Sequence, residues 1–130
     1  MAMKRLLVLA AVLEGVTGLA LMIDPPVVAR LLLGADVSGV GAAVGRVAGL
    51  AMLSLGLACW PFHGLASGHA PALLAMLTYN FLVACYLIYL GIGGQFAGVL
   101  LWPAAAIHGL LTILLVREWF RAVQTQDKKG

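Results

Sequence analysis

Residues 6–23 read LLVLAAVLEGVTGLALMI, an apolar run interrupted by a single carboxylate, that of Glu14. A bilayer core about 30 Å thick is crossed by a helix of about 20 apolar residues. Comparable runs follow along the chain at residues 41–60, 72–90 and 96–116. The sequence therefore predicts an all-α fold, a bundle of four transmembrane helices that forms one domain over residues 1–130.

The composition supports a membrane protein. Hydrophobic residues make up 63% of the 130 residues and charged residues 10%, whereas roughly a quarter of a soluble domain is charged. Lys4 and Arg5 before the first run resemble the start of a cleaved secretory leader. However, Glu14 interrupts the run where a leader stays apolar, and no small-x-small cleavage site precedes Asp24. We therefore expect the first run to remain as a span.

The positive charges predict the orientation, because cytoplasmic flanks of spans retain Lys and Arg. Six of them flank the two ends of the chain: Lys4, Arg5, Arg117, Arg121, Lys128 and Lys129. An even number of spans places both termini on one side. We expect a bacterial inner-membrane protein with both termini in the cytoplasm, and no nucleic-acid partner, since no basic stripe with interleaved aromatic residues is present.

The first connection begins Asp24-Pro25-Pro26 and continues with an apolar stretch too short to span. Asp24 can cap a helix that has Pro25 at its first position. Arg30 can then extend to the lipid phosphates. The sequence predicts a short interfacial helix after the first span.

Pro103 lies inside the fourth apolar run. A proline within a helix leaves the carbonyl four residues earlier without its partner, here that of Val99. We expect the fourth span to bend at this point unless neighbouring groups satisfy that carbonyl.

Gly41, Gly45 and Gly49 are spaced by four residues at the start of the second run. Rows of small residues at this spacing allow close contact between membrane helices. The sequence leaves open whether the neighbouring helix belongs to this chain, to a second copy or to another subunit. A homo-oligomer or a membrane complex is therefore expected among the partners, besides membrane lipids.

Cysteine and histidine spacing predicts neither a disulfide nor a metal site. Cys59 and Cys85 differ in predicted depth by roughly 20 Å, well beyond the roughly 7 Å that a disulfide allows between α-carbons. His63 and His69 lie in the turn between the second and third runs without a flanking cysteine or carboxylate.

Polar residues in different spans lie at similar depth. Counted at about 1.5 Å per residue from the cytoplasmic ends, Glu14, Asn80 and His108 lie about 12 to 14 Å deep. Arg46 enters from the opposite side. An ionised group at mid-bilayer costs at least about 2.5 to 3.5 kcal/mol, so we expect Glu14 to pair with Arg46 or to be protonated. The candidate site therefore comprises Glu14, Arg46, Asn80 and His108, supported by Thr17, Tyr79 and Thr112.

This cluster has two interpretations. In one, it is a structural lock whose hydrogen bonds fix the packing of the helices. In the other, it is a ligand or proton site in which His108 exchanges protons and Glu14 is its acid partner.

Glu14 in the first span of so small a protein resembles the single membrane carboxylate of the small multidrug resistance transporters. That resemblance implies exchange of protons for cationic drugs. Arg46 departs from it, because a fixed positive charge near the carboxylate competes with a cationic substrate.

The whole chain is more similar to the DoxX-like group of four-helix bacterial inner-membrane proteins. The resemblance is carried, in order, by RLLVLAAVLEGVTGLALMIDP, GRVAGLAMLSLGLACWP, YNFLVACYLIYLGIGG and LLWPAAAIHGLL. Some DoxX-like proteins are taken to be membrane subunits of quinone-linked oxidoreductases. The resemblance implies a role with a quinone or a partner protein, and no catalytic residue is carried across.

Three functions are therefore considered. The first is a membrane subunit or a lipid- or quinone-binding module, favoured because no recognised catalytic or soluble-cofactor motif is present. The second is a proton-coupled transporter of small molecules that uses Glu14 and His108. The third is a membrane enzyme that acts on a lipid-like substrate with these two residues as acid and base.

Overall fold

The computed structural model describes residues 2–60 and 70–127. Helices account for nearly all of this part of the chain, which contains no strand. They are α1 (Ala2–Ile23), α2 (Pro25–Leu33), α3 (Val40–Ala58), α4 (Ala70–Ile92) and α5 (Leu101–Asp127). All but α2 are long and apolar enough to cross a membrane. The all-α, four-helix membrane fold predicted from the sequence is confirmed, whereas His63 and His69 lie outside the described residues.

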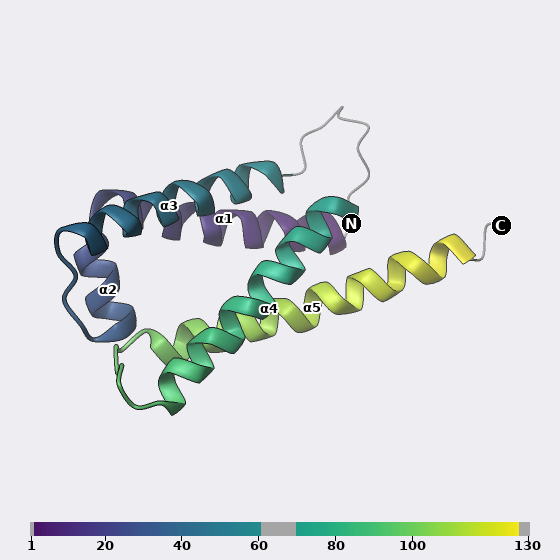
Figure 1. The fold of residues 1–130 in the computed structure, drawn as a ribbon. Coiled ribbons are helices and arrows are strands. Elements are labelled where there is room, and N and C mark those ends of the chain that lie inside the picture. The colour runs from purple at the N-terminus through teal and green to yellow at the C-terminus, as the bar shows by residue number, and fades with distance from the viewer. Residues whose placement is uncertain (1, 61–69, 128–130) are drawn as a thin grey trace.

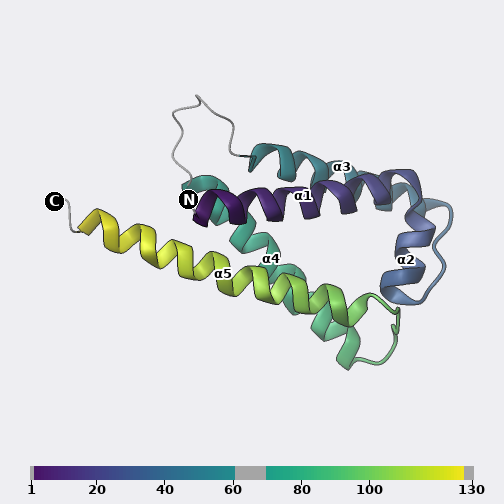
Figure 2. The same ribbon diagram turned by 180° about the vertical axis from the view of Figure 1, so that it is seen from behind.

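The four long helices are arranged as two pairs. Helix α1 packs antiparallel against α3, and α4 packs against α5 (Figure 1). Contacts between the α1/α3 pair and the α4/α5 pair are far fewer and are made mainly by α1. Seen from behind, α2 spans the separation between the two pairs at one end, and the start of α4 lies beside the start of α1 at the other end (Figure 2).

Glycines bring α1 and α3 into backbone contact. A β-carbon added to Gly49 would lie 2.6 Å from the carbonyl oxygen of Gly18, and one added to Gly18 would lie 2.7 Å from the carbonyl oxygen of Gly49. Gly45 is equally close to Pro25 at the start of α2, whereas Gly41 is exposed and meets only Val37 in the preceding turn. The glycine row therefore serves packing within this chain at two of its three predicted positions.

Helix α2 begins and ends as the sequence predicts. The Asp24 carboxylate accepts a hydrogen bond of 3.2 Å from the Val27 amide, and Pro25 occupies the first turn. Gly34 ends the helix in the left-handed conformation, with φ of 71°. The Arg30 guanidinium donates to Asp36 at 2.7 Å, so this side chain has a protein partner in addition to the expected access to lipid phosphates.

The fourth span begins at Leu101, later than the predicted start at residue 96. The amides of Ala97 and Leu100 donate instead to the carbonyls of Leu33 and Leu31, at 3.1 and 2.8 Å. The last carbonyls of a helix have no partner within it, and this segment supplies partners for those of α2. Apolar composition alone predicted a helix here because it does not distinguish a spanning residue from one that docks on another helix.

Pro103 is the third residue of α5 and therefore lies in its first turn. The amides of a first turn have no intrahelical acceptor, so a proline there removes no helical hydrogen bond. The predicted bend at Pro103 is wrong for this reason, and α5 runs without interruption from Leu101 to Asp127.

The main apolar core lies where α1 meets α4 and α5. Its fully or nearly fully buried members are Leu7, Ala10, Ala11, Cys59, Leu73, Met76, Leu111 and Leu115. Cys59 is a buried free thiol here, and Cys85 is a free thiol on the exposed side of α4. This core ends one turn before Glu14 in α1 and thereby positions the polar cluster described next.

Candidate functional site

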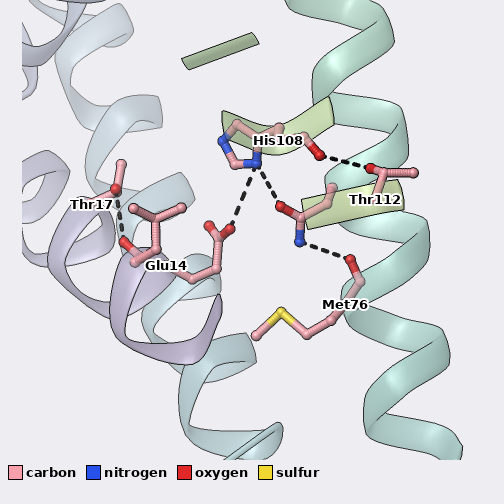
Figure 3. Close-up of polar contacts among 7 residues, drawn as sticks. Glu14, Thr17, Met76, His108 and Thr112 are labelled. Carbon is pink, nitrogen blue, oxygen red and sulfur yellow. Dashed lines mark hydrogen bonds and ion pairs between the residues drawn. The ribbon is translucent and has the colours of Figure 1, made fainter. Parts of the chain in front are cut away.

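Glu14 lies on the face of α1 that is turned towards the α4/α5 pair. Leu7, Ala10 and Ala11 precede it on this face at helical spacing and are buried, which fixes the side of α1 that faces inward. The Glu14 side chain is 1% exposed. Figure 3 shows its carboxylate pointing from α1 towards the ring of His108, and the distance from Oε1 to Nδ1 is 3.9 Å. This distance is too long for a hydrogen bond, but it places two ionisable groups side by side.

Asn80 and His108 form a hydrogen-bonded unit within the α4/α5 pair. The fully buried Asn80 donates through Nδ2 to the Met76 carbonyl at 2.9 Å, and its Oδ1 lies 2.8 Å from His108 Nδ1. Because Nδ2 is used by the carbonyl, Oδ1 is the acceptor that faces the ring, and the network assigns the proton to Nδ1. In the neutral ring Nε2 is then an acceptor, and no hydrogen bond from the described residues reaches it.

Tyr79 completes the site from α4. Its ring packs edge-to-face on His108, with a centroid distance of 6.0 Å and an interplanar angle of 74°. Its hydroxyl lies close to the Glu14 carboxylate, close enough for a weak hydrogen-bonding interaction, although the pair falls outside the distance and angle limits of a full hydrogen bond. Both Glu14 oxygens are thus buried and without a hydrogen-bond partner among the described residues.

Arg46 is not part of this cluster. It is exposed on α3, and within the described ranges the ion pairs of Glu14 include His108 but not Arg46. Gly45 and Gly49 face α2 and α1, and at about 100° per residue Arg46 points roughly 80° away from the middle of that face. The expected ion pair between Glu14 and Arg46 is therefore absent, because equal depth in the membrane does not ensure a common face.

Thr17 and Thr112 use their hydroxyls within their own helices. Thr17 Oγ1 donates to the Leu13 carbonyl at 2.9 Å, and Thr112 Oγ1 donates to the His108 carbonyl at 2.8 Å. Neither hydroxyl forms one of these hydrogen bonds with a side chain of the site. The two threonines therefore do not support the site as expected and bond only within their own helices.

Met76 is a member of the site that sequence reasoning missed. Its carbonyl orients the Asn80 amide, and its fully buried side chain extends from α4 towards α1 beside Glu14 (Figure 3). Its position four residues before Asn80 places both on one helix face, which is the signal that identifies it.

The site therefore has two parts with different bonding. Asn80 and His108 are connected within the α4/α5 pair, and Glu14 approaches them from the α1/α3 pair without a bond of its own. Such a carboxyl can accept a hydrogen bond when ionised, and can also donate one when protonated. No group of three or more histidine, cysteine, aspartate or glutamate side chains that could hold a metal ion occurs in the described part of the chain.

Comparisons of the chain with models of protein families, with curated proteins and with solved structures found no match.

Proposed function

We propose that this membrane protein binds a small ligand of the quinone or membrane-lipid class between its two helix pairs, where Glu14 and His108 hydrogen-bond the polar end of that ligand. The observation that carries the proposal is the Glu14 carboxyl, which is 1% exposed and has no hydrogen-bond partner among the described residues. A buried polar group without a partner costs about 1 to 3 kcal/mol, and a ligand that hydrogen-bonds to Glu14 would remove this cost.

The bonding pattern favours this proposal over the structural lock. The chain of hydrogen bonds from His108 through Asn80 to the Met76 carbonyl is complete without Glu14. A lock that included Glu14 would require a bond from α1 to this chain, and the distance of 3.9 Å is too long for one. Asn80 and His108 can therefore hold α4 against α5 without a hydrogen bond from Glu14.

The chemistry of the site favours a ligand with a hydroxyl or carbonyl at one end of an apolar body. Glu14, the Nε2 atom of His108 and the Tyr79 hydroxyl supply the hydrogen-bonding groups, and buried Met76 and Ala10 supply apolar surroundings. Quinones and the hydroxyl-bearing ends of lipids have this form.

The basic flanks of α1 and α5 support a bacterial inner-membrane location with both termini in the cytoplasm. Both termini lie at one end of the molecule, as this topology requires (Figure 1). In such a membrane the protein would act as a homo-oligomer or as the membrane subunit of a quinone-linked complex.

The test measures binding and stability of the same variant. Wild-type protein and Glu14→Leu are placed in lipid nanodiscs and titrated with a short-tailed benzoquinone, with tryptophan fluorescence as the readout. Loss of a hydrogen bond to a charged group is worth about 1.5 to 3 kcal/mol, so Glu14→Leu is expected to weaken binding about tenfold or more. Because leucine leaves no unpaired polar atom, the free energy of unfolding is expected to stay equal or to rise.

Thr17→Val is the matched control, because it removes a hydroxyl one turn away that bonds only within α1. It is expected to bind the quinone like the wild type. Absence of saturable quinone binding to the wild type would reject the quinone form of the proposal, and the same titration with a fluorescent phospholipid then tests the lipid form. A large loss of stability in Glu14→Leu would instead support the interpretation of the cluster as a structural lock.

One observation favours a second function, proton-coupled transport. Glu14 and His108 are ionisable, belong to different helix pairs and lie 3.9 Å apart, so movement of the pairs would change their interaction. The exposed position of Arg46 also removes the fixed positive charge that argued against a cationic substrate. In proteoliposomes with an imposed pH gradient, uptake of the cationic dye ethidium would be lost in Glu14→Gln, and equal uptake by this variant would exclude the function.

A further inference from the structure

An open cavity of about 290 Å³ lies between the start of α1 and residues 114–121 of α5. Its lining residues are Leu6, Leu114, Arg117, Glu118 and Arg121. Glu14 and His108 are not among them, so this cavity is separate from the site proposed above. Within the described residues, the membrane-spanning part of α5 ends at Arg121, which places the cavity at the boundary between the apolar core and the lipid headgroups.

The polar side of the cavity is positively charged. Arg121 donates through Nη1 to Glu118 Oε1 at 2.7 Å, which balances the one carboxylate in the lining. Arg117 is exposed and makes no ion pair within the described ranges. The lining therefore retains one net positive charge, and Lys4 and Arg5 in the preceding turn of α1 add to it.

The inner side of the cavity is apolar. Leu6 and Leu114 are half-buried and come from the two helices that enclose the space. The cavity thus has apolar side chains on one side and the Arg117 guanidinium on the other. This arrangement is complementary to a molecule in which a phosphate is joined to a hydrocarbon chain. Arginine suits phosphate, because its planar fork can donate two parallel hydrogen bonds to the phosphate oxygens.

We infer that this cavity binds the headgroup of an anionic phospholipid, with the phosphate on Arg117 and the first carbons of the lipid against Leu6 and Leu114. A volume of about 290 Å³ suits a headgroup rather than a whole lipid, whose chains extend along the outer surface of α1 and α5. Basic pockets between membrane helices near the cytoplasmic side bind acidic lipids in this manner. The inference does not depend on the ligand proposed for Glu14.

The test compares lipids that differ in net charge. Detergent-purified protein is given equal amounts of phosphatidylglycerol and phosphatidylcholine, and the lipid retained per protein is measured by native mass spectrometry. Preferential retention of phosphatidylglycerol is expected. One arginine near a lipid phosphate is worth about 1 kcal/mol or more, so Arg117→Gln is expected to lower that retention about fivefold.

Arg46→Gln is the matched control, because it removes the same charge from an exposed arginine on α3 that lies near the start of α2 and does not line the cavity. It is expected to retain phosphatidylglycerol like the wild type, and circular dichroism checks that both variants keep their helices. Equal retention of the two lipids would overturn the inference, as would an equal loss in Arg46→Gln. Displacement of the lipid by millimolar inorganic phosphate would identify the site as one for free phosphate.

Discussion

The contact of Gly18 with Gly49 predicts a sharp response to a single added methyl group. In Gly49→Ala the new β-carbon would lie 2.6 Å from the Gly18 carbonyl oxygen and 2.9 Å from the Met22 amide nitrogen. Both neighbours are backbone atoms of α1, so no side-chain rotation can relieve the clash. The two helices must move apart.

The size of the effect follows from the distances. Ordinary van der Waals contact begins at 3.4 Å, so the 2.6 Å contact must lengthen by about 0.8 Å. A gap of 0.5 to 1 Å forfeits about a quarter to a half of the dispersion energy between the atoms that separate. Overpacked helix contacts of this kind cost about 1 to 3 kcal/mol, which is the loss that we expect in the free energy of unfolding.

The assay is reversible unfolding in mixed detergent micelles, followed by circular dichroism as the fraction of sodium dodecyl sulfate rises. Gly109→Ala in α5 is the control, because a β-carbon at Gly109 would have no neighbour within 4 Å. This variant is expected to match the wild type or to exceed its stability slightly. The double variant with Gly18→Ala and Gly49→Ala is expected to lose less than the sum of the single losses, by at least about 0.5 kcal/mol, because one separation of the helices accommodates both methyl groups.

Two results would refute this reasoning. If Gly49→Ala were as stable as Gly109→Ala, the close approach of α1 to α3 would not contribute to stability. If the losses of the single variants simply added in the double variant, Gly18 and Gly49 would not share one contact.

Two further predictions concern the ends of the helices and the polar cluster. In Gly98→Ala the new β-carbon would collide with the Leu32 carbonyl group. Backbone amides near residue 98 and at the end of α2 are therefore expected to exchange hydrogen faster than in the wild type, as measured by mass spectrometry. Unchanged exchange would contradict the docking of residues 97–100 on α2. Asn80→Leu removes the acceptor of His108 Nδ1 and is expected to cost about 0.6 to 1.7 kcal/mol in the same unfolding assay. It should also shift the ring proton away from Nδ1 in ¹⁵N NMR spectra, and an unchanged tautomer would contradict the assigned network.

Much of the fold could be predicted from the sequence because two signals are local. The apolar length of each span is set by the thickness of a bilayer, and it identified all four long helices. Helix α2 was predictable from Asp24, Pro25 and the short apolar stretch, because capping depends on neighbouring residues. The start of α5 was not predictable from the sequence. Residues 96–100 are apolar like a span, but in the structure they dock on the end of α2 instead of joining the helix.

The candidate site was predictable in part. Depth along a helix brought Glu14, Asn80 and His108 to one level, and the structure places these three close together. Depth says nothing about direction around the helix axis, which is why Arg46 was assigned to the cluster and lies outside it. The glycine row gives a direction on α3, but only the structure shows that this row meets α1 and that Arg46 points away from it. The missing bond of Glu14 depends on distances between helices, which no pattern within one helix provides.

The backbone bonds from Ala97 and Leu100 to the end of α2 affect how the two helix pairs are held together. By covalent connection α2 follows α1, yet through these bonds it is attached to the segment that leads into α5. Separation of these peptide groups would leave two amides and two carbonyls without partners. Helix α2 is thus joined to both helix pairs and sets their spacing at this end of the molecule. The apolar core, which lies nearer the start of α1, holds the same pairs together by side-chain packing.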